Sequence, residues 1–293
     1  MAKTHILETD ALLVEISDAG AELCRVRDKE SGLERLWNAD PAVWNRHAPI
    51  LFPFVGKLTD GHYRVNGKEY CMKTQHGFAR DLDFVCTEAS DCLVAHCLCS
   101  SEQTREGYPF DFRLTVRHRV DAAKPRCLRI EWTVENCGEG RMLFSIGGHP
   151  GFLMPAGVRK EDCLIVFPGH DKLCYFNANS AGFALPEKTH CLRLEQGAAP
   201  FQPDIPDTWI FQDQGIDAVS IASPEGKPYV TLRCPGFPLL AVWANPKGPF
   251  ICLEPWYGRT DDAGFSGTLE EKTGIERLEA GERKDIAYEI EFH

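Results

Sequence analysis

The sequence predicts an all-β protein in which many short antiparallel strands form a large sandwich or barrel. Three observations support this fold class. Apolar and polar residues alternate in several segments, and an Asn-Gly pair lies between two strand-like segments. The 25 glycines and 19 prolines are spread along the chain at expected turns, whereas helical patterns are scarce.

The alternation is clearest in three segments. Leu128, Ile130, Trp132 and Val134 alternate with charged or polar residues, and residues 113–120 and 286–292 repeat the pattern. Successive side chains of a strand point to opposite faces, so each segment predicts a half-buried strand. Shorter strands are expected at residues 12–16, 163–167, 218–222, 229–233 and 239–243.

The pair Asn66-Gly67 predicts a β-hairpin between Tyr63 and Tyr70, because these residue types adopt the positive φ angles of a type I′ turn. Residues 268–278 contain helix formers, but Gly274 interrupts them, so only a few short helices are expected. The chain shows no break in composition, no low-complexity linker and no repeat. We therefore expect a single domain over residues 1–293.

The charge balance argues against two classes of partner. With 43 acidic and 32 basic residues the formal net charge is −11, whereas nucleic acids and anionic membranes attract positively charged proteins. No stretch reaches the ~18 consecutive apolar residues of a membrane helix, and the N-terminus lacks the pattern of a secretory signal. We expect no nucleic-acid or membrane partner.

The cysteine pattern predicts a reducing compartment. The 13 cysteines are scattered, several of them among apolar residues, and no C-x-x-C motif occurs. Buried free thiols behave as small apolar residues, and a disulfide framework is not indicated. A cytoplasmic location is therefore expected.

Several cofactor and nucleophile motifs are missing from the sequence. It has no phosphate-binding G-x-x-x-x-G-K-[ST] loop, no G-x-G-x-x-G after a strand, no H-E-x-x-H and no G-x-S-x-G. No cofactor and no metal are expected on this basis, although ligands from separate segments stay open.

Two histidine segments are candidates for a functional site. Residues 75–81 read QHGFARD, where Gly77 leaves space beside His76; a loop histidine next to a solvated arginine is the alternative. Residues 145–152 read SIGGHPGF, where two glycines and Pro150 flank His149. This backbone can hold the imidazole at a defined angle, and a tight turn with an incidental histidine is the alternative.

The third candidate segment contains an unusual carboxylate. Glu254 ends an apolar strand and is followed by Pro255-Trp256-Tyr257. A buried carboxylate needs a partner, for which Arg259 is a candidate. Alternatively, Glu254 is a general base whose basicity is raised by desolvation. Trp256 is either a platform under a sugar ring or a core residue.

Together with residues 48–58 (APILFPFVGKL), these segments resemble the aldose 1-epimerase (galactose mutarotase-like) family, and most of all its LacX-like bacterial branch. The motifs occur in the order and spacing of the family, and the resemblance covers essentially the whole chain. It implies a large antiparallel β-supersandwich with an open cleft, a cofactor-free mutarotase activity on an aldose with or without a phosphate, and a monomer or homodimer.

The resemblance also implies the roles of individual residues. Glu254 resembles the general base that takes the proton of the C1 hydroxyl, and His149 the general acid that protonates the ring oxygen. His76 resembles the histidine that positions the substrate. Arg80 resembles the arginine that follows this histidine in hexose-6-phosphate mutarotases. Three further substrate-binding candidates carry over less directly: Asp207, and Lys57 and Arg46 as alternatives for one family arginine.

Two rival functions stay open. A non-catalytic carbohydrate-binding or sugar-sensing protein could use the same scaffold. A glycoside hydrolase or lyase would need a carboxyl pair, for example Glu254 with Asp207 or Asp261.

Overall fold

The structure is a computed structural model that describes residues 3–155, 157–201 and 208–293. Within these ranges the named strands all pair antiparallel, and the helices are short, which confirms the predicted fold class. None of the described helices has the length and apolar character needed to cross a membrane. The helical segments are α1 (Glu102–Gly107) and the 3-10 turns η1 (Thr59–Gly61), η2 (Ala79–Asp81), η3 (Lys160–Asp162) and η4 (Leu269–Glu271).

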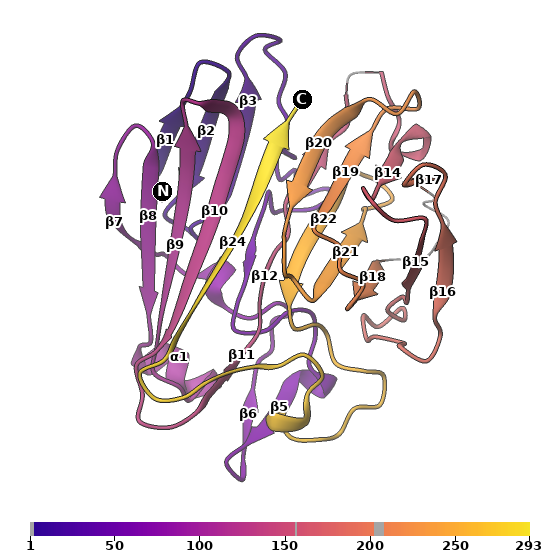
Figure 1. The fold of residues 1–293 in the computed structure, drawn as a ribbon. Helices are drawn as coiled ribbons and strands as arrows, with labels where there is room; N and C mark the ends of the chain where they lie inside the picture. Colours follow the sequence, from indigo (N-terminus) through magenta and orange to yellow (C-terminus); the bar gives the residue numbers. More distant parts are fainter. Residues whose placement is uncertain (1–2, 156, 202–207) are drawn as a thin grey trace.

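The largest sheet has nine strands among the described residues and extends across the molecule (Figure 1). Its central strands are the three segments with the clearest alternation. In sheet order the strands are β17 (Ala198–Pro200), β14 (Leu164–Val166), β19 (Ala218–Ala222), β20 (Pro228–Arg233), β24 (Arg283–Phe292), β10 (Lys124–Asn136), β9 (Phe112–Asp121), β8 (Leu93–Cys99) and β7 (Val85–Ala89).

Two further sheets lie behind the two halves of the large sheet (Figure 1). The first contains β1 (Thr4–Glu8), β2 (Leu12–Ser17) and β3 (Leu23–Asp28). The second contains β18 (Trp209–Gln212), β21 (Leu239–Trp243), β22 (Phe250–Tyr257), β12 (Ile146–Gly148) and β4 (Ile50–Leu51), with β13 (Gly151–Leu153) also paired to β22.

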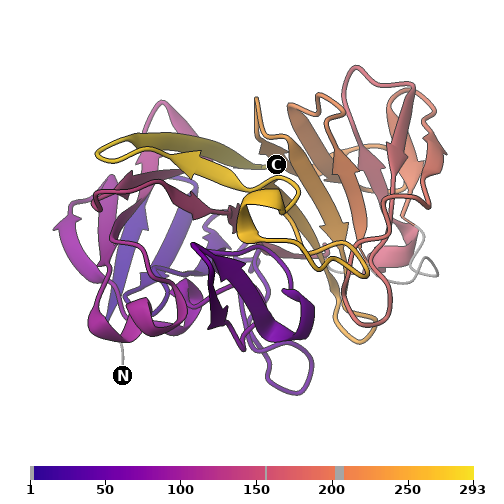
Figure 2. The same ribbon diagram turned by 90° about the horizontal axis from the view of Figure 1, so that it is seen from below.

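Three strand pairs stand apart from these sheets: β5 (His62–Val65) with β6 (Lys68–Cys71), β11 (Met142–Phe144) with β23 (Glu276–Leu278), and β15 (Lys172–Tyr175) with β16 (His190–Arg193). The first pair is the predicted hairpin, in which Asn66 and Gly67 have φ angles of 51° and 71°. Figure 2 shows this hairpin beside the segment that contains η4.

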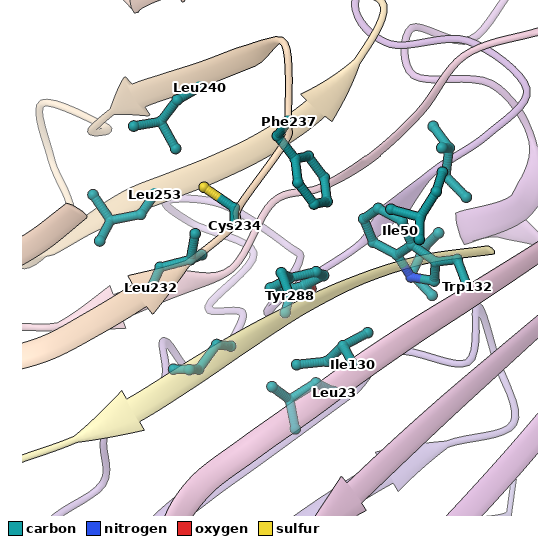
Figure 3. Close-up of a cluster of buried hydrophobic side chains, with 14 of the residues drawn as sticks. Leu23, Ile50, Ile130, Trp132, Leu232, Cys234, Phe237, Leu240, Leu253 and Tyr288 are labelled. Atoms are coloured by element: carbon teal, nitrogen blue, oxygen red, sulfur yellow. The ribbon is translucent and has the colours of Figure 1, made fainter. Parts of the chain in front are cut away.

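The main hydrophobic core lies between the large sheet and the sheets behind it. Trp132 of β10 and Tyr288 of β24 face Leu240 of β21 and Leu253 of β22 across this space (Figure 3). Burying each large apolar side chain contributes roughly 1.5–3 kcal/mol. The alternate residues predicted to be buried in β10 are 0–1% exposed, which fixes the face each strand turns inward.

Candidate active site

One strand of the smaller six-stranded sheet supplies the floor of the candidate site. Side chains at alternate positions of a strand share a face, so Cys252, Glu254 and Trp256 of β22 point the same way. Leu253 points to the other side, into the main core. The predicted apolar strand thus carries its carboxylate on the face opposite that core.

His149 lies directly across from Glu254. The pairs Gly147↔Trp256 and Gly151↔Cys252 flank the break between β12 and β13 in one continuous register. This register brings His149 Nε2 to 3.3 Å from Glu254 Oε2. Two segments that are distant in the sequence therefore place an imidazole and a carboxyl group in contact.

Glycine at position 147 is required by the packing of this pair of strands. A Cβ added there would lie 2.5 Å from Cδ1 of the Trp256 indole. Any side chain would push that ring away from β12. Gly147 therefore allows the Trp256 indole to lie close against the backbone of β12, two residues before His149.

The pair opens onto a cavity of ≈ 310 Å³, within the usual range for sites that bind small molecules. Its wall combines aromatic, amide, hydroxyl and cationic side chains. The side chains and backbone that line it belong to Trp44, Gly56, Lys57, Gln75, His76, Arg80, His149, Ala178, Asn179, Ser180, Gly182, Thr208, Ile210, Trp243, Asn245, Glu254, Trp256 and Thr260.

His76 reaches the same cavity from the loop before η2. Its backbone has a φ of 67°, a left-handed conformation that is uncommon for a residue other than glycine. The Gly56 N–H donates to His76 Nδ1 at 3.0 Å, so the neutral ring carries its proton on Nε2. Its ring stands edge-on to that of His149, with centroids 5.6 Å apart.

Gly77 explains how this loop approaches the floor so closely. A Cβ at Gly77 would lie 2.3 Å from the carbonyl oxygen of Phe52, and its φ is 71°. The sequence motif predicted space beside the imidazole. The space is instead filled by the backbone of the Phe52–Pro53 segment, which holds the loop that carries His76 in place.

Glu254 has no permanent cation as a partner among the described residues. It is 1% exposed, and its ion-pair contact is with His149 alone. Arg259, the partner considered from sequence, instead pairs with Asp262 at 2.6 Å and donates to Gln212. Burial raises the pKa of Glu254 well above its usual value, and the indole of Trp256 opposes part of this rise.

His149 has the complementary shift. Burial lowers the pKa of His149 to about 3, and the positive charge of Arg80 acts in the same direction. The ring packs against the indole of Trp44, with centroids 4.9 Å apart, and edge-on against Trp243 at 5.4 Å. Both members of the pair are therefore biased toward their uncharged forms.

The cationic candidates divide into two groups. Arg80 and Lys57 line the cavity; Arg80 donates to the Gln75 carbonyl at 2.7 Å and Lys57 Nζ to the Ala181 carbonyl at 2.8 Å. Arg46 does not line it. Its guanidinium donates to the Arg80 carbonyl at 2.9 Å and pairs with Asp81, so its charge is directed at the loop behind the site.

The two aspartates considered from sequence do not complete a carboxyl pair here. Asp207 lies outside the described residues. Asp261 is buried in an ion pair with Lys272 at 2.6 Å and accepts from the Thr59 N–H at 2.8 Å. It does not line the cavity of Glu254, so it offers no second carboxylate for a hydrolase.

Several cavity residues escaped the sequence analysis. Two of them, Trp44 and Asn245, lie near each other, because the Asn245 amide donates to the carbonyl of Val43, the residue before Trp44, at 3.1 Å. Trp243 is the last residue of the correctly predicted strand β21, and Asn245 lies in the loop that follows it. Binding residues are often found in such loops. Asn179 belongs to a region whose sequence carried no recognisable motif.

Cys252 gives the pair a third neighbour with a ligand atom. The side-chain ligand atoms of His149, Cys252 and Glu254 lie within 4.8 Å of one another, a set that could hold a transition metal. A metal there would occupy the lone pairs of Glu254 and His149. Since the same lone pairs are needed for proton transfer, the two uses exclude each other.

Comparison with known proteins gives a consistent result. A family model for aldose 1-epimerase matches residues 3–199. The chain is 29% identical over 303 aligned positions to the chromosomal protein LacX of Lactococcus lactis subsp. lactis, covering 97% of each chain.

Two solved structures agree in fold over nearly the full length. A galactose mutarotase related enzyme from Lactobacillus acidophilus has a TM-score of 0.93 and 30% identity, covering 99% of this chain and 97% of that one. A galactose mutarotase-like protein from Lactobacillus casei has a TM-score of 0.90 and 31% identity, covering 99% and 100%. The chain belongs to the aldose 1-epimerase family.

Proposed function

We propose that this protein is a mutarotase that interconverts the α and β anomers of an aldose by acid–base opening and closing of the sugar ring. The observation that carries the proposal is the 3.3 Å approach of Glu254 Oε2 to His149 Nε2 at the floor of a cavity. No Lys or Arg among the described residues neutralises Glu254. A structural carboxylate buried this deeply normally has such a partner.

The pair has the proton count that the reaction needs. The raised pKa of Glu254 and the lowered pKa of His149 both favour an arrangement in which the pair holds one proton, on the carboxyl group. Moving this proton to His149 gives a carboxylate and an imidazolium with the same total charge. The two arrangements are the base–acid pair for ring opening and the acid–base pair for ring closure.

The reaction then balances without any other reactant. Glu254 accepts the proton of the C1 hydroxyl while the bond between C1 and the ring oxygen breaks, and His149 protonates that oxygen. The open aldehyde rotates about C1–C2. In closure, His149 takes the proton back from the hydroxyl as it attacks C1, and Glu254 returns a proton to the former carbonyl oxygen.

His76 and the tryptophans supply positioning. The Gly56 N–H occupies His76 Nδ1, which leaves Nε2–H as a hydrogen-bond donor to a sugar oxygen. Trp44, Trp243 and Trp256 give the cavity apolar surfaces that suit the C–H faces of a pyranose ring. Arg80 and Lys57 add positive charge to the same wall, where a hydroxyl or an anionic group of the sugar would lie.

The test is to measure anomer exchange by NMR magnetisation transfer with glucose, galactose and their 6-phosphates. We expect the wild-type protein to accelerate exchange of at least one sugar. His149→Asn should keep binding of that sugar but lose exchange by on the order of 10²–10⁴-fold, the usual contribution of a positioned acid or base.

A different outcome would favour the alternative function. If the wild-type protein binds these sugars but exchange stays at the uncatalysed rate, the protein is a carbohydrate-binding or sugar-sensing member of the family. If His149→Asn exchanges anomers as fast as the wild type, the proposed acid is wrong even though the protein is an enzyme.

A further inference from the structure

A second cluster of polar side chains lies away from the sugar cavity, at the edge where two sheets meet. It consists of His5 on β1, Asp18 after β2, Cys86 on β7 and His96 on β8. Figure 1 shows β1, β7 and β8 at one side of the molecule, and β1 packs on β8. We call these four residues the edge cluster.

The donor atoms of the edge cluster converge. His5 Nε2 lies 2.8 Å and His96 Nε2 lies 3.1 Å from the same oxygen, Oδ1 of Asp18. One ligand atom each from His5, Cys86 and His96 lie within 4.8 Å of one another. Ligands of a tetrahedral zinc ion are about 3.3–3.7 Å apart, given bond lengths of about 2.0–2.3 Å. His5, Cys86 and His96 would need small movements to reach this range, and Asp18 does not belong to that set of three. His5 faces Asp18 with Nε2 and the Cys86 thiol with Nδ1, at 3.9 Å, so binding of one ion by all four side chains requires the His5 ring or one of these two partners to reorient.

The imidazoles are held in place before any ion arrives. His96 is 0% exposed and His5 is 7% exposed, and their rings meet edge-on with centroids 5.4 Å apart. Asp18 and Cys86 remain partly exposed, which leaves a route for an ion from solvent. The two imidazoles are thus buried together, and an oxygen and a sulfur ligand lie at the accessible side of the cluster.

The charges of the edge cluster also favour a cation. Among the described residues, the ion-pair partners of Asp18 are His5 and His96. Neither is a permanent cation. His96 Nδ1 is buried and has no hydrogen-bond partner among the described residues. One ring nitrogen of the cluster is therefore left without a hydrogen bond.

We propose that the edge cluster binds a zinc ion through His5, His96, Asp18 and Cys86. Two imidazoles, a thiolate and a carboxylate form a set that zinc prefers over magnesium or calcium. His5 comes from β1 of the three-stranded sheet and Asp18 from the turn after β2, whereas Cys86 and His96 come from the nine-stranded sheet. The ion would therefore tie together the edges of two sheets.

Titration of the metal-free full-length protein with Co²⁺, followed by absorption spectroscopy, tests this site. We expect one equivalent to give the visible bands of tetrahedral cobalt and a near-ultraviolet thiolate band, both of which Zn²⁺ removes. Zinc should raise the Tm by on the order of 5 °C at saturation, because the assembled site binds the ion more tightly than the cysteines and histidines of the unfolded chain do.

Three variants locate the ion. His5→Gln should abolish the cobalt bands, and Asp18→Asn serves as a second test if His5→Gln fails to fold by circular dichroism. Cys86→Ser should lose the thiolate band. Cys92→Ser, an exposed cysteine on the same β7–β8 hairpin, is the matched control and should keep it.

Three results would overturn the proposal: no cobalt bands in the wild-type protein, bands that survive in both His5→Gln and Asp18→Asn, or a thiolate band lost in Cys252→Ser instead of Cys86→Ser. The last result would assign the ion to the sugar cavity. Because the signals are spectroscopic, they do not depend on mutarotase activity, and failure here leaves the proposed function unaffected.

Discussion

Strand β22, at the floor of the cavity, and the loop that follows it each bury a carboxylate, and the two carboxylates have different kinds of partner. Asp261 is 4% exposed and pairs with Lys272 Nζ at 2.6 Å. Glu254 is 1% exposed, and its ion-pair contact among the described residues is with an imidazole biased toward its neutral form. The first arrangement compensates a buried charge, whereas the second keeps a proton available. The contrast is what we expect if Asp261 serves stability and Glu254 serves the proposed chemistry.

The largest expected effect follows from Glu254→Gln. The amide keeps the shape of the side chain but cannot accept the C1 hydroxyl proton, so anomer exchange should fall by on the order of 10²–10⁴-fold. The circular dichroism spectrum should match that of the wild type. Exchange at the wild-type rate in this variant would remove the distinction between the two carboxylates.

Asp261→Asn should show the reverse pattern. The substitution leaves Lys272 buried without its counter-charge, and breaking a buried ion pair typically costs about 3–5 kcal/mol of unfolding free energy. Activity per folded molecule should stay within a few-fold of the wild type. Urea unfolding measures the first quantity and the exchange assay the second. Unchanged stability would show that the pair with Lys272 is not compensating a charge.

The pH dependence of stability sharpens the comparison. Burial raises the pKa of Glu254 above its unfolded value, so its contribution to stability is complete below the unfolded pKa and is lost as pH rises through the folded pKa. Glutamine does not ionise. Glu254→Gln should therefore gain stability relative to the wild type between pH 4 and pH 8.

Urea midpoints of both proteins across this range give the measurement. Burial lowers the pKa of His149 to about 3, so both proteins lose stability as pH falls below the usual pKa of histidine. Because His149 is present in both proteins, we expect this loss to cancel in the difference between them. A difference that shrinks as pH rises would mean that Glu254 is ionised in the resting state.

The smallest expected effect concerns the loop behind the site. Arg46→Ala removes the contacts to the Arg80 carbonyl and Asp81. Since exposed ion pairs contribute about 0.2–1 kcal/mol, the KM should rise by roughly 2- to 5-fold with kcat nearly unchanged. Arg80→Ala, which removes a cavity side chain, is the matched comparison and should raise the KM more. A larger effect of Arg46→Ala would indicate direct contact with substrate.

Part of the site was predictable from local sequence. Trp256 and Glu254 share a face because strand residues alternate, and His149 stood out because Pro150 and three glycines surround it. Trp44 and Asn179 carried no such signal. Their contribution depends on loops from distant segments that close around β22, and no local pattern records which loops those are.

By itself, the sequence determined the strand-rich architecture, the buried face of its central strands and the Asn66-Gly67 hairpin, because period-two alternation and turn chemistry act between neighbours in the chain. Only the tertiary structure decided that Arg259 turns to Asp262 and leaves Glu254 to His149. The reason is physical: the charge state of a buried group depends on what surrounds it in three dimensions, and those surroundings come from segments that the sequence does not join.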